Sequence, residues 1–251
     1  CTLPTHNVPY PTPSGRVIPL GTLYACPALR CMCLGTLGWH FNEQARELLG
    51  AHPFDVLHFH EPFVPFLSPT VLDQSDTVNI ATFHAFGGFS PSYWVGRNFA
   101  RGLAAKLHCR IAVSGPARHF ISRHFPGDYR IIPNGVDLDR FADAEPLEEL
   151  RDGTINILFV GRFEERKGLI HLLRAYHRLR KRHVDARLLV IGSGPKAREY
   201  RRYVGLRQIR DVEFLGRVTD DAKARYFASA DIFCAPATGQ ESFGIVLLEA
   251  M

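Results

Sequence analysis

Thr238-Gly239-Gln240-Glu241-Ser242-Phe243-Gly244-Ile245-Val246-Leu247-Leu248-Glu249-Ala250-Met251 are the last fourteen residues of the chain. A strand-like run, residues 231–235, leads into the Pro and Gly turn that opens this stretch. The pattern after the turn predicts the opening of a helix, with Glu241 at the helix mouth. Glu249 follows eight residues later, which is close to two helical turns, so we expect both carboxylates on nearly the same face.

A helix mouth is a natural place for an anion, because unpaired backbone N–H groups and the positive end of the helix dipole meet there. A carboxylate on each side of such a cradle can accept hydrogen bonds from hydroxyl groups. The stretch therefore suits a sugar that is joined to a nucleotide through phosphates. The two glutamates are also compatible with a capped helix that carries two acidic side chains on its surface.

A second candidate site for phosphate lies at the carboxyl end of a predicted strand, where ligands of parallel sheets gather. Gly161 and Arg162 end this strand, and Lys167 opens the next helix. Arginine offers a planar fork of donors to phosphate oxygens, whereas lysine offers a point charge. We therefore expect Arg162 and Lys167 to bind a diphosphate, and we interpret Arg166 as a spare surface charge.

Strand and helix patterns alternate along most of the chain, as expected of parallel sheets with crossover helices. The predicted strands are residues 54–59, 78–83, 111–113, 155–160, 187–191, 212–215 and 232–235. The predicted helices include residues 92–108, 167–182, 196–206 and 220–229. A turn at residues 133–135 and an acidic stretch at 137–152 predict a linker. The expected domains are therefore 1–145 and 146–251.

Five segments together resemble the motifs of the family 4 retaining glycosyltransferases. They are Glu241 to Glu249, Gly-Arg-Phe-Glu-Glu-Arg-Lys-Gly at 161–168, Pro-Asn-Gly-Val-Asp at 133–137, and the segments 54–62 and 81–84. The resemblance is strongest to the phosphatidylinositol mannosyltransferase branch and covers the chain from about Pro53 to its end. It implies an α/β fold of the GT-B type, with two Rossmann-like parallel-sheet domains that face a cleft. It also implies that both domains are incomplete here, the first on the acceptor side and the second binding the nucleotide sugar.

The resemblance implies a role for each candidate residue. Glu241 would bind sugar hydroxyls and stabilise an oxocarbenium-like centre, and Glu249 would hold the ribose hydroxyls. His84 would face the donor sugar and phosphate, although a lone histidine after a strand is often structural. The implied catalytic set is His84, Glu241, Arg162 and Lys167. The implied donor-binding set is Gly161, Arg162, Lys167, Glu241, Ser242, Phe243, Gly244, Ile245 and Glu249.

The resemblance further implies a retaining hexosyltransferase that moves mannose from GDP-mannose to a phosphatidylinositol-like lipid at the cytoplasmic face of the membrane. A UDP- or ADP-sugar donor and another lipid or glycan acceptor stay open. The one Asp-x-Asp of the sequence, Asp137-Leu138-Asp139, lies in the predicted linker. We therefore expect no metal requirement and no cofactor besides the nucleotide sugar.

Composition and motifs limit the other functions that the sequence could have. The net charge of +5 and the pI near 9.0 fit phosphorylated small molecules, anionic lipid or nucleic acid. RNA binding would require aromatic residues interleaved with basic ones, and no such run is present. Gly192-Ser193-Gly194 runs into Pro195 and lacks the third glycine of a nicotinamide fingerprint, and no pyridoxal-phosphate lysine motif of a sugar phosphorylase is found. A catalytically silent membrane- or nucleotide-binding domain is the alternative from another class.

Membrane contact is expected at the surface only. Residues 17–41 are apolar but contain Arg30, two prolines and three glycines, which argues against a spanning helix. The basic helix at 92–108, beside Phe86, Phe89, Tyr93 and Trp94, is compatible either with an anionic membrane surface or with a solvated face over a core stripe. Six cysteines without disulfide spacing predict cytosolic free thiols. Because the chain begins at Cys1 and ends inside a predicted helix, we interpret it as a poorly active fragment.

Overall fold

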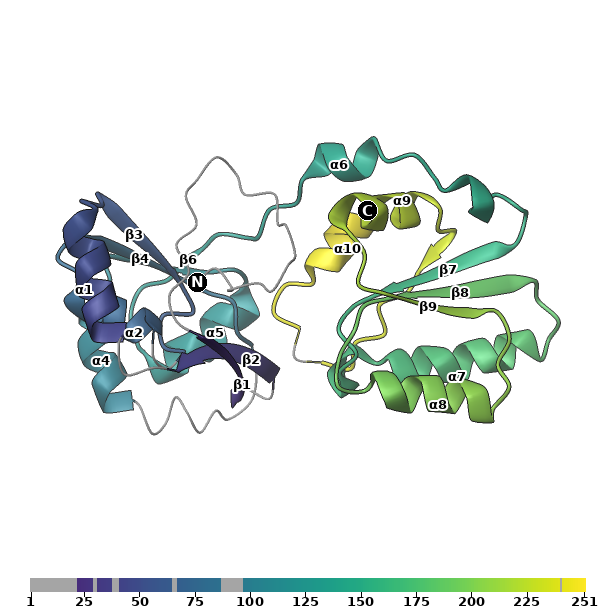
Figure 1. The fold of residues 1–251 in the computed structure, drawn as a ribbon, viewed down its shortest axis with the longest axis horizontal. Helices are drawn as coiled ribbons and strands as arrows, with labels where there is room; N and C mark the ends of the chain where they lie inside the picture. Colours follow the sequence, from purple (N-terminus) through teal and green to yellow (C-terminus); the bar gives the residue numbers. More distant parts are fainter. Residues whose placement is uncertain (1–21, 29–30, 38–40, 65–66, 87–96, 240) are drawn as a thin grey trace. The chain divides into compact units, whose positions relative to one another are not determined.

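The protein folds into two α/β units, each built around a parallel sheet. A computed structural model describes residues 22–28, 31–37, 41–64, 67–86, 97–239 and 241–251. The chain divides after Pro133 into unit 1, residues 1–133, and unit 2, residues 134–251. Each unit is described by itself below, with the element labels of Figure 1.

Unit 1 contains a parallel sheet in the order β3-β4-β5-β6 and an antiparallel hairpin of β1 and β2. Its strands are β1 (Thr22–Ala28), β2 (Cys31–Leu37), β3 (Val56–His60), β4 (Val78–Phe83), β5 (Cys109–Ala112) and β6 (Arg130–Ile131). Its helices are α1 (Phe41–Ala51), α2 (Leu67–Gln74), α4 (Arg97–Ala105) and α5 (Gly115–His124). The hairpin falls within the apolar stretch 17–41, and no described helix is long and apolar enough to cross a membrane.

One apolar core holds unit 1 together. Phe59, Ala81 and Phe83 from the sheet pack against side chains of the helices, among them Leu72 and Leu103. Burial of such side chains is worth about 1.5–3 kcal/mol each relative to exposure. The apolar side of α4 therefore belongs to the core, as the core-stripe interpretation of this helix predicts, and contact with a membrane stays a prediction.

Unit 2 contains a parallel sheet in the order β10-β7-β8-β9. Its strands are β7 (Ile155–Val160), β8 (Ala186–Ile191), β9 (Val212–Gly216) and β10 (Ile232–Phe233). Its α-helices are α6 (Leu138–Ala142), α7 (Leu169–Arg180), α8 (Ala197–Leu206), α9 (Asp220–Ala228) and α10 (Ile245–Ala250), and its short 3-10 helices are η1 (Glu148–Leu150) and η2 (Glu165–Lys167).

Helices cover both faces of the sheet of unit 2, α7 and α8 on one face and α9 and α10 on the other (Figure 1). Consecutive residues of a strand point to opposite faces. Ile157 and Phe159 accordingly join the core beneath α7 and α8, whereas Leu158 joins the core that includes Phe227 of α9. Both cores are apolar because β7 and β8 are buried on both sides, which is why they appear in the sequence as unbroken hydrophobic runs.

The division between the units lies earlier in the chain than residue 145. The segment after Pro133 is not a bare linker, because it forms α6 and η1 and packs on unit 2. Phe141 of α6 stands edge-on to Phe227 with ring centroids 5.8 Å apart, and Leu150 of η1 is buried in the second core. The acidic residues of the segment predicted a solvated linker, but its apolar residues decide where it packs.

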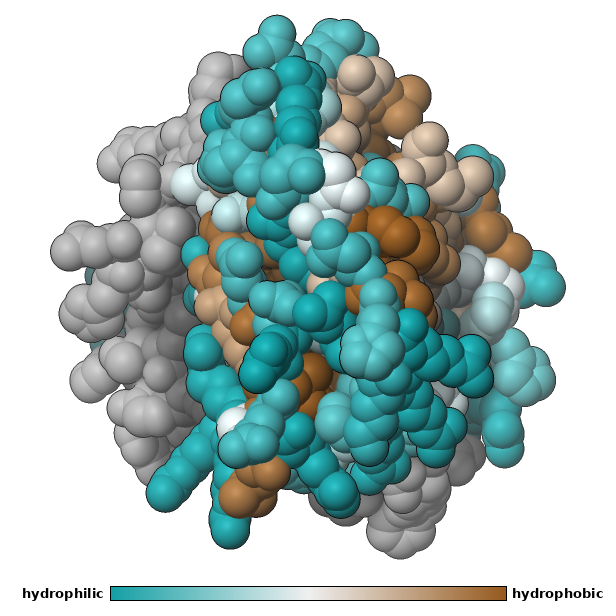
Figure 2. Space-filling view, turned by 90° about the vertical axis from the view of Figure 1, so that its right-hand side faces the viewer, coloured by the Kyte–Doolittle hydropathy of each residue, from teal (hydrophilic) through white to brown (hydrophobic). Residues whose placement is uncertain are grey.

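The surface is mostly hydrophilic on the face shown in Figure 2, with hydrophobic residues in smaller patches. Large hydrophobic side chains of unit 2 that are exposed include Ile232 of β10 and Leu247 of α10. Residues 1–16, whose Pro, Thr and Ser content predicts a loop, and the aromatic residues Phe89, Tyr93 and Trp94 lie outside the described residues.

Candidate functional site

The predicted phosphate loop joins β7 to α7 in unit 2. Gly161 follows β7 directly, and its N–H donates to the carbonyl of Ile191 at 3.0 Å. The chain then turns through η2, and Gly168 takes the left-handed conformation (φ 72°) from which α7 begins. Lys167 is the last residue of η2 and lies just before α7, not at its start as predicted, and its side chain is only 16 % exposed.

Glycines allow this loop to pack tightly on its neighbours. A Cβ atom on Gly168 would overlap the carbonyl oxygen of Pro236, and one on Gly192 would overlap that of Gly161. A Cβ atom on Gly194 would lie 2.7 Å from the backbone nitrogen of Phe163. The Gly-x-Gly after β8 thus serves close contact between two loops, which gives it a structural reason independent of dinucleotide binding.

Five charged side chains form one cluster around the loop, which we call the cation–glutamate cluster: Arg162, Glu164, Arg166, Lys167 and Glu241. Lys167 donates to Oε2 of Glu241, and Arg166 approaches the same oxygen at 3.7 Å. Glu164 holds both arginines, Arg162 at 2.8 Å and Arg166 at 3.0 Å. The interpretation of Arg166 as a spare surface charge is therefore wrong, because its guanidinium joins two carboxylates.

The balance of charge suits an anion. Three cations face two carboxylates in the cation–glutamate cluster, and Arg162 is 47 % exposed, whereas Glu164 is 10 % exposed. Charge-assisted hydrogen bonds to phosphate oxygens are strong, and arginine binds phosphate through two parallel donors. The cluster can thus accept a diphosphate at its arginine side, with the carboxylate of Glu241 adjacent.

Glu249 lies apart from the cation–glutamate cluster, on α10. Its Oε1 accepts from Lys223 of α9 at 2.9 Å, and its side chain is 10 % exposed. Its Oε2 is buried and has no hydrogen-bond partner among the described residues. A buried carboxylate oxygen without a partner is costly, so this oxygen marks a position where a donor from a ligand would be stabilising.

Helix α10 begins later than predicted. Gly244 takes the left-handed conformation (φ 78°), so the helix starts at Ile245. Glu241 therefore lies in the segment before the helix, and the expectation that both glutamates share one helical face is wrong. The carboxylate of Glu241 is held instead by Lys167 and Arg166, which lie in the loop before α7. Lys167 and Glu241 are 74 residues apart along the chain.

The remaining residues of the predicted donor set surround these groups. Gly244 is buried, and a Cβ atom built on it would lie 3.7 Å from Cγ of Glu241. Ser242 and Phe243 are partly buried in the same turn, and Ile245 is 38 % exposed at the start of α10. Glu164 and Lys223 were not predicted. Glu164 could have been found from the sequence, because a carboxylate in an extended segment between Arg162 and Arg166 can pair with both arginines. No sequence pattern pointed to Lys223.

Unit 1, taken by itself, contains a cluster of histidines at the carboxyl ends of β3 and β4. Nδ1 of His60 and Nε2 of His84 lie 2.8 Å apart, at hydrogen-bond distance. Burial lowers the pKa of His84, and the nearby His58 lowers it further; burial also lowers the pKa of His60, as do His58 and His84. Both rings are therefore favoured in the neutral form. These residues are not arranged to hold a metal ion, nor is any group of three or more His, Cys, Asp or Glu in the described part of the chain.

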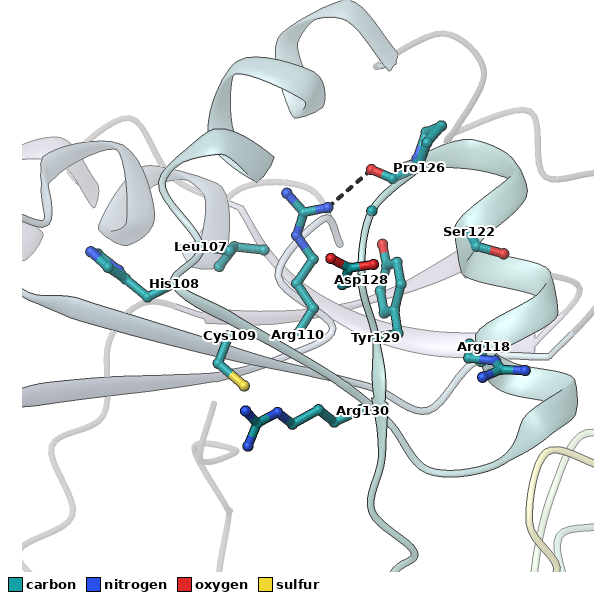
Figure 3. Close-up of a pocket in the computed structure, with 11 residues that line it drawn as sticks. Leu107, His108, Cys109, Arg110, Arg118, Ser122, Pro126, Asp128, Tyr129 and Arg130 are labelled. Carbon is teal, nitrogen blue, oxygen red and sulfur yellow. Dashed lines mark hydrogen bonds between the residues drawn. The ribbon is translucent and has the colours of Figure 1, made fainter.

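An open pocket of about 930 Å³ lies at the other end of the same sheet, between β5, β6 and α5. It is lined by Arg110, Arg118 and Arg130 among others, but their guanidinium groups lie apart (Figure 3). Arg110 is held by the carbonyl oxygens of Pro126 and Ala104 at 3.1 and 2.8 Å. We assign this pocket no role in the site.

Comparisons with known proteins identify the family of the chain. The family model described as "Glycosyltransferase Family 4" matches residues 10–140, and the one described as "Glycosyl transferases group 1" matches residues 154–251. A phosphatidyl-myo-inositol mannosyltransferase of Mycobacterium tuberculosis is 39% identical over 238 residues, which is 94% of this chain and 61% of that protein. The Propionibacterium freudenreichii protein of the same name is 33% identical over 79% of this chain and 50% of its own length. The chain thus spans less than two thirds of these relatives.

Solved structures share the fold. Sucrose-phosphate synthase from Thermosynechococcus elongatus matches with a TM-score of 0.65 and 22% identity, over 91% of this chain and 62% of that chain. The Anabaena protein HepE, solved in complex with UDP and glucose, matches with a TM-score of 0.67 and 17% identity, over 85% of this chain and 62% of that chain. The two parallel-sheet units are those of a GT-B glycosyltransferase, as the motifs predicted. With a family model that covers more than half of the sequence, the chain belongs to glycosyltransferase family 4.

Proposed function

We propose that the protein transfers a hexose from a nucleoside diphosphate sugar, with retention of configuration, and that the pair of substrates is GDP-mannose and a phosphatidylinositol-type lipid. The observation that carries this proposal is the cation–glutamate cluster, in which Lys167 and Arg166 converge on Glu241 beside the half-exposed Arg162. The names of the relatives from Mycobacterium and Propionibacterium support the choice of mannose and of the lipid.

In the proposed reaction, negative charge grows on the leaving diphosphate while positive charge grows at the anomeric carbon. Arg162 and Lys167 would stabilise the diphosphate, and protein cations would take the place of a metal ion. Preorganised hydrogen-bond donors and cations supply most of the transition-state stabilisation in such a step, and the loss of one lowers the rate by about 10²–10³-fold.

The donor would also rearrange the cluster. A phosphate that binds Lys167 competes with Glu241 for the same ammonium group, since both are anions. Glu241 would then be available to the hydroxyls of the sugar, which is the role that the resemblance assigns to it. Ser242, Phe243, Gly244 and Ile245 would line this part of the donor site, and Gly161 would let the chain approach the phosphates.

Glu249 supports the nucleotide side of the proposal. Its buried Oε2 lacks a partner in the described chain, and a ribose hydroxyl is a donor of the right kind. Lys223 keeps the other oxygen in place at 2.9 Å. The proposed contact would therefore satisfy the one polar atom of this side chain that the protein leaves unpaired.

The lipid acceptor places the proposed reaction at the inner face of the cytoplasmic membrane, with the protein bound peripherally to the anionic surface. The exposed Arg101 on α4 supports such contact with unit 1. A UDP-sugar is the second candidate donor, because HepE was solved with UDP and with glucose. An acceptor other than an inositol lipid would accompany it.

Calorimetry on the full-length protein tests the donor. We expect GDP to bind more tightly than UDP and ADP, with the same affinity in Mg²⁺ and in EDTA. A preference for UDP or ADP would replace mannose by another sugar, and dependence on Mg²⁺ would remove the metal-free mechanism. If no nucleotide binds, the protein is a silent binding domain and the proposal is wrong.

Variants of the cation–glutamate cluster test the chemistry. We expect Lys167→Ala and Glu241→Ala to lower transfer to a phosphatidylinositol acceptor by at least ~10²-fold while the protein stays folded. Lys196→Ala is a matched control, because Lys196 also pairs with a glutamate, Glu199, but at an exposed position on α8's first turn. Transfer at the normal rate by either cluster variant would contradict the mechanism.

A further inference from the structure

Three histidine rings stand in a row at the carboxyl ends of β3 and β4. His58 and His60 are two residues apart on β3, and His84 follows β4 directly. The ring centroids of His58 and His60 are 4.7 Å apart, and those of His60 and His84 are 5.1 Å apart, with the planes inclined by less than 30° in both pairs. His60 therefore lies between the other two rings.

The contact between His60 and His84 couples the proton positions of the two rings. Nδ1 of His60 and Nε2 of His84 are 2.8 Å apart, and a neutral imidazole carries one donor nitrogen and one acceptor nitrogen. One ring must donate and the other accept. If His60 donates, Nε2 of His84 is an acceptor and the proton of His84 resides on its Nδ1.

Glu61 fixes the backbone of the same histidine. Its Oε1 accepts from the N–H groups of both His84 and Ala85, each at 2.5 Å. Glu61 itself adopts a positive φ of 52°, and its own N–H donates to the carbonyl of Thr82 at 2.9 Å. A residue with a Cβ atom rarely takes this conformation, and it persists where the surroundings hold it. Here the turn directs the carboxylate across to the end of the neighbouring strand.

The surroundings favour the neutral form of both rings. Burial lowers the pKa of His60 and of His84, and the neighbouring histidines lower it further. Within the described part of the chain, the titratable groups beside the pair are His58 and Glu61 from the β3 side, and the carboxylate of Glu61 accepts from backbone N–H groups. Both rings are thus neutral near pH 7, so that one of them donates and the other accepts in their N–H···N hydrogen bond.

We propose that His60 and Glu61 are positioning residues for His84, with Glu61 fixing its backbone and His60 fixing its ring so that Nδ1–H is presented to an oxygen of the donor substrate. A sugar diphosphate is rich in acceptor oxygens, so a histidine that meets it is most useful as a donor. This inference rests on the proposed function, together with the role that the resemblance implies for His84, which is to face the donor sugar and phosphate.

The test uses two variants of His60 in the full-length protein. Phenylalanine at this position keeps a flat ring between His58 and His84 but removes the hydrogen bond. Asparagine places an amide near the position of Nδ1, so it keeps a partner for Nε2 of His84. We expect His60→Phe to lower kcat/KM at pH 7.5 at least tenfold and to change the pH dependence on the acid side, and His60→Asn to retain most of the activity.

Nitrogen NMR of the histidines supplies a readout that does not depend on turnover. We expect the wild type and His60→Asn to show His84 protonated at Nδ1, and His60→Phe to show a shift toward the Nε2–H tautomer. His108→Phe is the matched control. Nδ1 of His108 accepts from the N–H of Asn79 at 3.0 Å at the opposite end of β4, so this variant loses a hydrogen bond without affecting the tautomer of His84.

Glu61→Gln tests the backbone contact, because an amide oxygen can still accept but carries no charge. We expect a higher KM for the donor with a smaller change in kcat. Wild-type kinetics and an unchanged tautomer in His60→Phe would overturn the inference, as would equal losses in His60→Phe and His60→Asn. Full activity of His84→Phe would instead remove His84 from the proposed function, whereas the NMR result would still decide whether His60 sets its tautomer.

Discussion

Gly168 is a residue at which backbone conformation alone demands glycine. Its φ is 72°, and a Cβ atom would overlap the carbonyl oxygen of Pro236. We expect Gly168→Ala to lower the free energy of unfolding by about 1–3 kcal/mol, because the strained conformation and the overlap add. Urea unfolding measures this change, and calorimetry with GDP then shows whether the loop still binds.

Gly102→Ala is the matched control for that substitution. Gly102 lies within α4, and no heavy atom lies within 4 Å of the place where its Cβ would be. Alanine should be stabilising there by roughly 0.5–1 kcal/mol, since glycine is a poor helix residue. Similar changes in the free energy of unfolding for Gly168→Ala and Gly102→Ala would contradict the requirement for glycine at position 168.

Single residues also show where the sequence was informative. Lys167 and Glu241, both members of the implied donor-binding set, are in contact, whereas Arg162 pairs with Glu164. The roles of Arg166 and Lys223 were missed, because each depends on a contact with a residue far along the chain. A local pattern gives the type of side chain available, whereas the long-range contact decides which charges meet.

At the scale of elements, Tyr176 ties α7 to the sheet of unit 2. Its ring is buried, and its hydroxyl lies 2.7 Å from the carbonyl oxygen of Ala186 and 2.9 Å from that of Asp211. We expect Tyr176→Phe to lower the free energy of unfolding by about 1–2 kcal/mol, since the carbonyl oxygens of Ala186 and Asp211 each lose one of their hydrogen-bond donors. Tyr203→Phe, which changes a partly buried tyrosine of α8 in the same core, should cost less than ~0.5 kcal/mol.

The same tyrosine gives a pH dependence with a definite sign. Burial raises the pKa of Tyr176 to about 12, from an ordinary value of 10.0. The unfolded chain therefore loses the phenolic proton first, and the stability contributed by this group is complete below pH 10 and is lost as the pH rises toward 12. Urea unfolding at pH 9, 10 and 11 should show the advantage of the wild type over Tyr176→Phe shrinking. A constant difference would mean that the hydroxyl titrates normally.

Elements with strong hydrophobic patterns were predictable to within a residue or two. The strand at 155–160 and the strand at 78–83 form as expected, because buried parallel strands are continuous apolar runs. The start of α10 was not predictable from periodicity. Gly244 ends the preceding turn in a left-handed conformation, and this excludes Glu241 from the helix despite the favourable spacing of the two glutamates.

At the scale of the whole molecule, the segment after Pro133 belongs to unit 2. Phe141 is edge-on to Phe227 and lies under the ammonium group of Lys223, 5.5 Å from its ring centroid. We expect Phe141→Ala to lower the free energy of unfolding of unit 2 by about 1–2 kcal/mol, given the loss of both contacts. Hydrogen exchange of the amides in α9 would show the change locally.

Leu138→Ala is the comparison within the same short helix. Leu138 is 70 % exposed, so its replacement should alter stability by less than ~0.5 kcal/mol. If both variants matched the wild type, the segment would be a free linker up to residue 145, as its acidic composition suggested. The alternation of strands and helices predicted two α/β units well, but composition could not say to which of them α6 belongs.

The close packing of the Gly-x-Gly after β8 has a consequence for protein engineering. Since Gly192 and Gly194 leave no room for a Cβ atom against Gly161 and Phe163, both glycines must be kept when either loop is redesigned. A combinatorial library that randomises positions 161–168 to change donor preference should keep both glycines fixed. In a library that randomises both loops independently, the two loops would clash in most variants.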